Sequence, residues 1–166
     1  ADGLLVVTPY YNKATQKGLI KHFTTIADAV KIPVILYNVP GRTGVNMTAE
    51  TTLRLAEIEN IVAVKEASSK REQILEILEK RPAGFAVLSG NDDETLDLMK
   101  NGAEGIISVA SNVTPSMVAD LAHNMLEGKV AEAEALHEKL LPLFRNCFVE
   151  SNPIPAKAAL HAMGFI

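Results

Sequence analysis

Residues 60–68 read Asn60-Ile61-Val62-Ala63-Val64-Lys65-Glu66-Ala67-Ser68, an apolar run that stops at a charged side chain. A run of β-branched and small residues that ends in this way predicts a buried strand emerging from a sheet. The preceding run, Pro33-Val34-Ile35-Leu36-Tyr37-Asn38, also ends in an ionisable group, the phenol of Tyr37. Alternate residues of a strand point to opposite faces, and both faces of the 61–65 run are apolar. Helices can cover one face, and the interior of a barrel would cover the other.

Strand-like runs alternate with helical patterns along the first two thirds of the chain. The strands are expected at Leu4–Thr8, Val34–Tyr37, Ile61–Lys65, Phe85–Leu88 and Gly105–Val109. The helices between them are expected at Lys17–Val30, Ala49–Ala56, Arg71–Lys80 and Asp93–Lys100. Each interval leaves room for one crossover helix, and short crossovers of this kind force parallel strands with right-handed connections. The pattern therefore predicts an α/β fold.

Only helices are expected after Val109. Thr114 or Ser116 caps a helix that runs to about Glu127 and ends at Gly128. A second helix is expected at Ala131–Val149, and a third has Pro155 in its first turn and ends near Gly164.

An internal echo bears on how the chain begins. Gly102-Ala103-Glu104-Gly105-Ile106-Ile107 leads from a helix into a strand, and Ala1-Asp2-Gly3-Leu4-Leu5 repeats that pattern. We therefore expect the chain to start inside a helix-to-strand turn, as if an earlier helix had been cut away. Five strands are too few for an eight-stranded barrel, and an open sheet also fits the pattern.

Composition excludes several classes of partner. The net charge of −4 over 166 residues provides no electrostatic footprint for nucleic acid or an anionic membrane surface. No apolar stretch approaches the roughly 20 residues that span a bilayer. The single cysteine, Cys147, excludes an internal disulfide and suits a reducing compartment, so a cytoplasmic location is expected. Its helical surroundings favour a buried thiol over a nucleophile.

Lys65 is the residue with the clearest chemical potential. In sheets and barrels of parallel strands, chemistry sits at the carboxyl ends of the strands. A lysine partly withdrawn from water there loses some of its preference for the charged form, and a neutral amine can attack a carbonyl. The alternative is that Lys65 only caps the strand and pairs with Glu66 or another neighbour.

Other polar clusters carry less weight. Asp92-Asp93-Glu94 could suggest a metal site, but acids at a helix N-terminus explain them better. The histidines lack ligand spacing and the glycine clusters lack a phosphate-binding fingerprint, so neither a metal nor a phosphate site is expected. The histidines are His22, His123, His137 and His161, and the glycine clusters lie within residues 41–44 and 102–105.

A set of motifs, taken together, resembles the dihydrodipicolinate synthase and N-acetylneuraminate lyase family. In chain order they are Thr8-Pro9-Tyr10-Tyr11-Asn12, Leu36-Tyr37-Asn38-Val39-Pro40-Gly41-Arg42-Thr43-Gly44, Val64-Lys65-Glu66-Ala67-Ser68, Leu88-Ser89-Gly90-Asn91-Asp92, Gly105-Ile106-Ile107-Ser108-Val109 and Asn152-Pro153-Ile154-Pro155-Ala156-Lys157. The resemblance implies a partial (β/α)8 barrel, equivalent to strands 4–8, over residues 1–113. It implies the last barrel helix and the C-terminal helical region over residues 114–166. The resemblance also implies that the family's first three βα units, and the end of its C-terminal region after Ile166, are missing here.

The resemblance also implies roles for particular residues. Lys65 would form a Schiff base with the keto group of pyruvate, with Tyr37 as the proton relay and Tyr11 as a second relay tyrosine acting across a subunit interface. Arg42 would bind the carboxylate of the incoming aldehyde. Gly90 and Ile107 match positions that line the pyruvate pocket through backbone contacts. Tyr10 matches one position of an allosteric pocket for lysine, and the relay threonine of the family has no counterpart here.

The activity implied is condensation of pyruvate with aspartate semialdehyde to 4-hydroxy-tetrahydrodipicolinate, in lysine and diaminopimelate biosynthesis. No cofactor is implied, because the protein's own lysine makes the Schiff base. Two alternatives stay open: another pyruvate-dependent aldolase of the family, of the N-acetylneuraminate lyase or keto-deoxy sugar acid type, and a catalytically silent fragment with a structural role. Because the synthase branch carries an arginine at the position of Arg42, that branch is favoured. A homo-oligomer, a dimer of dimers when intact, is implied as well.

Overall fold

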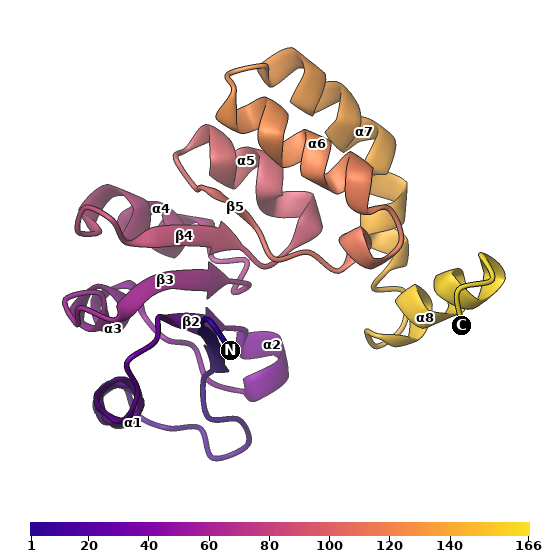
Figure 1. Ribbon diagram of the computed structural model, residues 1–166. Helices are drawn as coiled ribbons and strands as arrows, with labels where there is room; N and C mark the ends of the chain where they lie inside the picture. Colours follow the sequence, from indigo (N-terminus) through magenta and orange to yellow (C-terminus); the bar gives the residue numbers. More distant parts are fainter. The chain divides into compact units, whose positions relative to one another are not determined.

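The structure is a computed structural model and describes residues 1–166. The strands form a sheet in the order β1-β2-β3-β4-β5, with β1 pairing β2 and β2 pairing β3 in parallel (Figure 1). Their bounds are β1 Leu4–Val7, β2 Val34–Asn38, β3 Ile61–Glu66, β4 Ala86–Ser89 and β5 Gly105–Ile106. The helices are α1 Gln16–Ala29, α2 Pro40–Thr43, α3 Ala49–Leu55, α4 Arg71–Lys80, η1 Asp92–Glu94, α5 Thr95–Lys100, η2 Ala110–Asn112, α6 Pro115–Leu126, α7 Val130–Asn146 and α8 Ile154–Ala162. The predicted α/β fold with parallel strands is confirmed.

The chain divides into two compact units. The first comprises Ala1–Leu88 with Asn101–Ala103, and the second comprises Ser89–Lys100 with Glu104–Ile166. The division at residue 113, between barrel and C-terminal region, stays a prediction. None of the helices combines the length and the apolar composition that crossing a bilayer requires.

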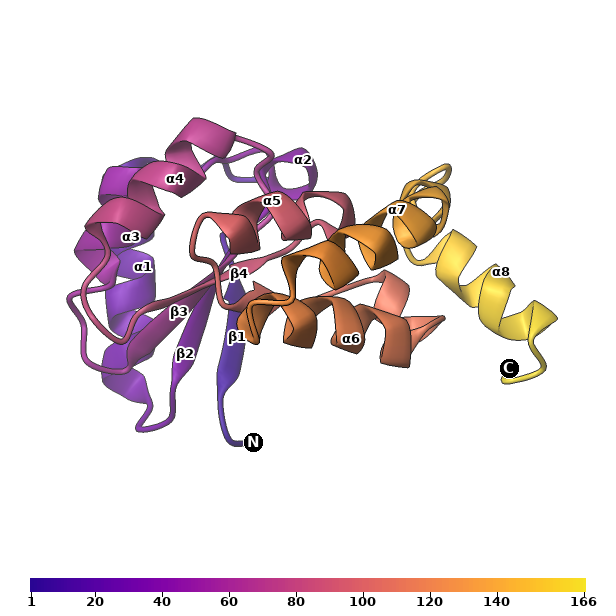
Figure 2. The same ribbon diagram turned by 90° about the horizontal axis from the view of Figure 1, so that it is seen from above.

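In the first unit, α1, α3 and α4 lie along one face of the strands (Figure 2). Alternation along β2 places Val34, Leu36 and Asn38 at 0% exposure, whereas Ile35 and Tyr37 between them are only half-buried. The helices therefore cover the even-numbered face of β2. The odd-numbered face carries Tyr37, together with its register partner Lys65 on β3.

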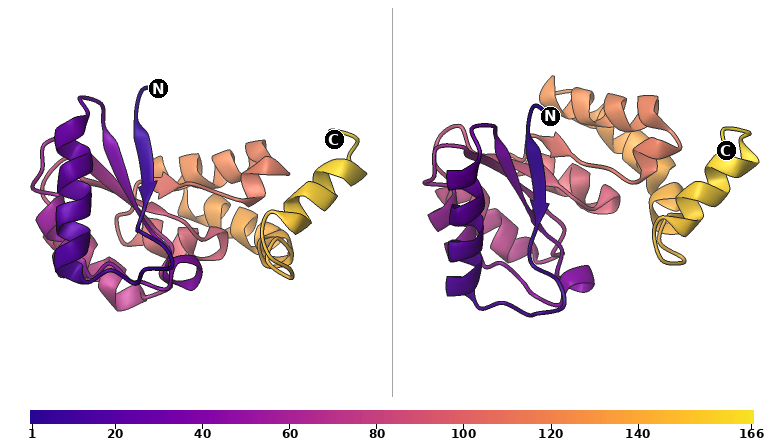
Figure 3. Two further views of the ribbon diagram at one scale, coloured as in Figure 1. Left: turned by 90° about the horizontal axis from the view of Figure 1, so that it is seen from below. Right: turned by 60° about the horizontal axis from the view of Figure 1, so that its bottom comes forward.

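The outer strand of the first unit is β1, whose arrow starts beside the N-terminus in Figure 3. Its register with β2 pairs Leu5 with Ile35 and Val7 with Tyr37, so both β1 residues lie on the face that the helices leave uncovered. Leu5 is 46% exposed as a result. An apolar side chain at a sheet edge is a surface on which another strand or molecule can dock.

In the second unit, α6 packs along α7 and over η2. The core there combines Ala110, Val118, Leu121, Leu140, Phe144 and Cys147. Cys147 is 2% exposed, and burial raises the pKa of its thiol above the ordinary value. The expectation of a buried thiol is confirmed.

The fifth strand is shorter than predicted, because the Asp92 carboxylate binds backbone N–H groups of the segment that would have extended the strand. The Asp92 carboxylate, 1% exposed, accepts hydrogen bonds from the backbone N–H groups of Val109 at 3.0 Å and Ala110 at 3.1 Å, and from the Ser108 hydroxyl. These bonds turn residues 107–112 out of the sheet and into η2. The expected strand Gly105–Val109 therefore ends at Ile106, although Ile107 N–H still donates to the Ser89 carbonyl at 2.9 Å.

The remaining boundaries lie within two residues of the sequence prediction, except at the end of α7. The segment directly after β2 forms the single turn α2, which Gly44 closes in the left-handed conformation with its N–H on the Pro40 carbonyl at 2.9 Å. The helix expected to reach Val149 ends at Asn146. Beyond Cys147 the backbone bonds shorten to three-residue turns, as in Phe148 N–H to the Arg145 carbonyl at 3.1 Å.

Thr8 carries a buried hydroxyl that finds no hydrogen-bond partner. The residue is 0% exposed at the end of β1. A buried donor left unsatisfied destabilises the folded state by about 1–3 kcal/mol. We expect Thr8→Val to raise the free energy of unfolding by about 1 kcal/mol, measured as a higher urea midpoint with an unchanged slope. Thr25→Val is the matched control, because its hydroxyl donates to the Lys21 carbonyl at 2.8 Å and is exposed; a gain of the same size there would contradict the explanation.

Candidate active site

Lys65 and Tyr37 are register partners at the carboxyl ends of β3 and β2. Lys65 is 9% exposed, and its Nζ lies 4.3 Å from the centroid of the Tyr37 ring. A cation at this distance over an aromatic face is attracted to the ring. The two side chains that the sequence singles out therefore meet on the face of the sheet that the helices do not cover.

The phenol of Tyr37 is held in its protonated form. Burial raises the pKa of Tyr37 above its ordinary value, and the positive charge of Arg42 acts in the opposite direction. Arg42 is exposed and sits in the one-turn helix α2 that follows β2 directly. Its effect on the phenol places its charge within electrostatic reach of the Lys65–Tyr37 pair.

We expect Arg42→Ala to raise the pKa of Tyr37 further, because the substitution removes the one charge that lowers it and leaves the burial. The measurement is a titration of ¹³C-labelled tyrosine by NMR, with the Tyr37 signal assigned from Tyr37→Phe. Arg54→Ala is the matched control, since Arg54 pairs with Glu57 on the outer helical surface. A Tyr37 pKa that stays the same or falls in Arg42→Ala would contradict the assignment.

Tyr11 lies on a loop with a strained backbone, and this loop is hydrogen-bonded to the residue that follows Arg42. Its backbone has φ of 70°, and its N–H donates to the Thr43 carbonyl at 3.2 Å. A bulky residue in the left-handed region is an outlier whose strain the surrounding structure must hold in place. The side chain of Lys13 packs against Gly44, with its Cε 3.5 Å from where a Cβ at that glycine would lie. The side chain of Tyr11 is 90% exposed, and that of the neighbouring Tyr10 is 69% exposed.

Gly90 and Ile107, the two predicted pocket residues, belong to the second unit. Gly90 is buried directly after β4, and Ile107 is half-buried directly after β5. The bond between Ile107 N–H and the Ser89 carbonyl joins their two segments. Both lie at the ends of strands, and their part in a pyruvate pocket stays a prediction.

The sequence prediction missed a polar pair behind the lysine. Asn38 and Glu66 are both 0% exposed, and Asn38 Nδ2 donates to Glu66 Oε1 at 2.5 Å. They are register partners one residue beyond Tyr37 and Lys65, and consecutive strand residues face opposite sides. The signal available in the sequence was two polar residues at consecutive strand ends.

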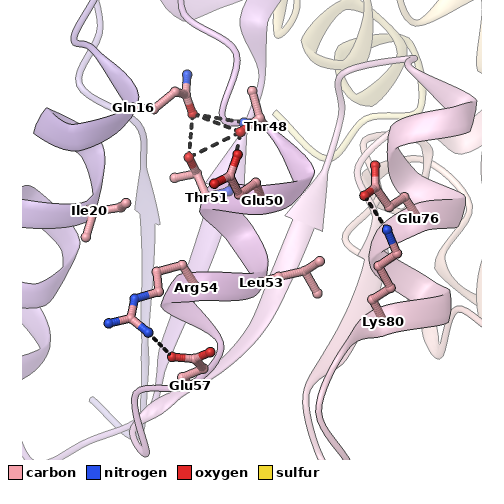
Figure 4. Close-up of a pocket in the computed structure, with 10 residues that line it drawn as sticks. All are labelled: Gln16, Ile20, Thr48, Glu50, Thr51, Leu53, Arg54, Glu57, Glu76 and Lys80. Carbon is pink, nitrogen blue, oxygen red and sulfur yellow. Dashed lines mark hydrogen bonds and ion pairs between the residues drawn. The ribbon is translucent and has the colours of Figure 1, made fainter.

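A groove on the outer helical surface contains none of the predicted site residues (Figure 4). It holds about 470 Å³ between α1, α3 and α4. Gln16 lies at the end of the groove drawn at the top of Figure 4, where its Oε1 accepts from the Thr51 hydroxyl at 2.7 Å and from the Thr48 backbone N–H at 3.1 Å. These bonds tie the start of α1 to the start of α3, which is a structural task.

Comparison with known proteins relates the chain to one family throughout. The sequence matches the dihydrodipicolinate synthetase family over residues 1–166. The 4-hydroxy-tetrahydrodipicolinate synthase of Geobacter sulfurreducens is 54% identical over 164 residues, which cover 99% of this chain and 57% of that protein. This chain spans about 55–57% of the length of the curated relatives that it matches.

Solved structures agree with that match. The dihydrodipicolinate synthase of Acinetobacter baumannii, solved in complex with pyruvate, superposes with a TM-score of 0.97 at 45% identity, covering 100% of this chain and 57% of that one. The synthase of Cyanidioschyzon merolae, solved with lysine bound, superposes with a TM-score of 0.95 at 46% identity, covering 99% of this chain and 56% of that one. The expected fold, part of a (β/α)8 barrel followed by helices, is confirmed by these likenesses.

Proposed function

This chain belongs to the dihydrodipicolinate synthetase family. We therefore propose that it carries the Schiff-base lysine of an enzyme that condenses pyruvate with aspartate semialdehyde. The observation that supports the proposal is the proximity of Lys65 and Tyr37 at the carboxyl ends of adjacent strands, where Lys65 Nζ lies 4.3 Å from the centroid of the Tyr37 ring. The relative solved with pyruvate supports the choice of the keto acid.

In the proposed reaction, the neutral amine of Lys65 attacks C2 of pyruvate, and water leaves as the C=N bond of the imine forms. The protonated imine withdraws electrons, so that the methyl group loses a proton and becomes an enamine carbon. That carbon attacks the aldehyde carbon of the second substrate, whose oxygen takes up a proton. The amino group of the condensed product then attacks the imine carbon, so that the ring closes and Lys65 leaves as the free amine by transimination. Covalent catalysis of this kind divides one hard carbon–carbon bond formation into easier steps.

Tyr37 and Arg42 have distinct parts in this proposal. The protonated phenol of Tyr37 donates a proton to the departing hydroxyl of the carbinolamine, which a lysine engaged in the bond cannot do for itself. The guanidinium of Arg42 binds the carboxylate of the aldehyde substrate through its planar fork of donors. Tyr11 completes the relay from an exposed loop, and Gly90 and Ile107 line the pyruvate pocket.

A competition between aldehydes tests the second substrate. The test protein is this chain joined to the portions of the Geobacter sulfurreducens relative that it does not cover, called here the completed barrel. We expect kcat/KM with pyruvate to be highest for aspartate semialdehyde among aspartate semialdehyde, N-acetylmannosamine and glyceraldehyde. A higher value for either sugar would favour the other aldolases of the family. No turnover of any aldehyde by the completed barrel would contradict the proposed enzyme function.

Exposed apolar side chains lead us to propose that the chain associates when it is alone. Leu5 at the open edge is 46% exposed, and Phe165 and Ile166 are 71% and 61% exposed. We expect the 166-residue chain to form oligomers or aggregates with little activity, because unpaired edges and uncovered apolar faces associate in water. Light scattering after gel filtration measures this, with the completed barrel as the control. A monodisperse monomer that turns over substrate as fast as the completed barrel would contradict it.

Regulation and location follow as smaller parts of the proposal. Tyr10, 69% exposed beside the relay tyrosine, is proposed to contact lysine as a feedback inhibitor. The relative solved with lysine bound supports this role. The single reduced cysteine supports a cytoplasmic location.

A further inference from the structure

A buried side-chain bridge joins β2 to β3 directly behind the Lys65–Tyr37 pair. Asn38 Nδ2 donates to Glu66 Oε1 at 2.5 Å, and the Ser68 hydroxyl donates to Glu66 Oε2 at 2.5 Å. The backbone adds a parallel tie, because the Ala67 N–H donates to the Asn38 carbonyl at 2.9 Å. The ends of both strands are therefore fixed to each other on the side opposite the reacting groups.

The same asparagine closes the loop that carries Arg42. Its Oδ1 accepts from the Met47 backbone N–H at 2.9 Å, and the second N–H of its Nδ2 is shared between the Met47 carbonyl at 3.2 Å and Asn46 Oδ1 at 3.1 Å. Loop 39–47 thus leaves β2 at Asn38 and returns to the Asn38 side chain. Arg42 sits between these two attachment points.

The helices hold the returning end of this loop from outside. Gln73 of α4 donates to the Met47 carbonyl at 3.1 Å and accepts from Asn46 Nδ2 at 2.8 Å. Gln16 of α1 donates to the Asn46 carbonyl at 2.8 Å, and its oxygen contacts Thr48 and Thr51 as Figure 4 shows. Asn38 is the member of this network that contacts the loop and the catalytic strands alike.

We propose that Asn38 and Glu66 are positioning residues that fix the spacing of Lys65 and Tyr37 and hold Arg42 beside them. This inference rests on the proposed Schiff-base function. Burying an amide and a carboxylate costs more than burying apolar side chains of the same size, unless every hydrogen bond is made. An apolar pair would fill the same space under the helices. What the polar pair adds is direction, since hydrogen bonds fix the orientation of both strand ends and of the loop.

The first test asks whether Asn38 holds Arg42 near Tyr37, by a double-mutant cycle on the pKa of Tyr37. In the otherwise unchanged protein, Arg42→Ala is expected to raise that pKa. In the Asn38→Ala background we expect Arg42→Ala to produce less than about half that shift, because the released loop has already carried the guanidinium away. The titration is carried out on the completed barrel, where Tyr37→Phe assigns the signal.

Asn60→Ala is the matched control for this cycle. Asn60 Nδ2 donates to the carbonyls of Ala27 at 2.9 Å and Val30 at 3.2 Å, a clamp of the same chemistry at the amino end of β3. We expect the full Arg42 effect to remain in that background. An equal Arg42 effect in all backgrounds would overturn the positioning role of Asn38.

The second test separates positioning from folding by kinetics and by rescue. In the completed barrel, Asn38→Asp places two carboxylates together, and we expect kcat to fall roughly 10- to 100-fold with a smaller change in the KM for pyruvate. Adding Glu66→Gln restores an amide–carboxylate pair with the partners exchanged, and kcat should recover at least in part. A drop in kcat no larger than in Asn60→Ala, or a double variant no better than Asn38→Asp, would contradict the proposal.

The outcomes distinguish the inference from the function on which it rests. A parent protein that forms no pyruvate adduct would remove the proposed function, while the Tyr37 titration would still decide whether Asn38 holds Arg42. A parent that forms the adduct, with an Arg42 effect that survives Asn38→Ala, would keep the function and remove the inference.

Discussion

Lys65→Ala in the completed barrel is expected to lower kcat/KM for the condensation by about 10⁴-fold or more, because it removes the atom that bonds to pyruvate. Lys65→Arg should be equally inactive. A guanidinium keeps the positive charge and part of the packing, but it stays protonated and cannot attack a carbonyl. The measurement is steady-state turnover of pyruvate and aspartate semialdehyde.

Two comparisons make this result specific. Lys31→Ala removes an exposed lysine that precedes the amino end of β2 and should leave turnover unchanged. The urea midpoint of Lys65→Ala should stay close to that of the unchanged protein or rise, since the substitution removes a mostly buried ammonium group. Activity of Lys65→Arg within tenfold of the parent, to about 1.4 kcal/mol, would exclude Lys65 as the nucleophile.

Tyr37→Phe should lower kcat by about 10²- to 10⁴-fold while leaving the ring beside Lys65 in place, because it deletes only the hydroxyl group that donates the proton. Pyruvate adduct formation should slow with it, since loss of water from the carbinolamine needs that proton. Stopped-flow measurement of imine formation and steady-state turnover together check this. A variant that forms the adduct at the normal rate would assign the relay to another group.

The pH dependence provides a second check on Tyr37. Because the phenol must be protonated to donate, activity should be retained below its pKa and lost as the pH rises through it. Burial raises that pKa, so the alkaline limb should lie above the ordinary tyrosine value of about 10. Arg42→Ala should move this limb to still higher pH. A limb that Tyr37→Phe leaves in place would belong to a different group.

The parallel strands and the pairing of Tyr37 with Lys65 could be predicted from the sequence because two successive apolar runs each end near an ionisable side chain. The runs ending at Tyr37 and Lys65 predict strands, and parallel pairing brings their carboxyl ends to one edge. The structure pairs those two residues in register. The sequence pattern therefore sufficed for the part of the site that consecutive strands create.

Long-range polar contacts could not be read in this way. The fifth strand ends early because Asp92 captures the backbone of Val109 and Ala110, which lie 17 and 18 residues further along. The Asn38–Glu66 bridge depends on the register of β2 and β3, which shifts between Val34 and Ile35. The residues of either strand alone do not predict that shift. The sequence also does not show which two polar residues will be buried in contact with each other.

The most direct test of the account is to trap the imine with borohydride in the presence of pyruvate and to map the adduct by peptide mass spectrometry. Schiff-base formation by Lys65 predicts one pyruvyl group per chain, carried by Lys65 in the completed barrel and absent from Lys65→Arg. An adduct on any other lysine, or no adduct in a folded completed barrel, would contradict it.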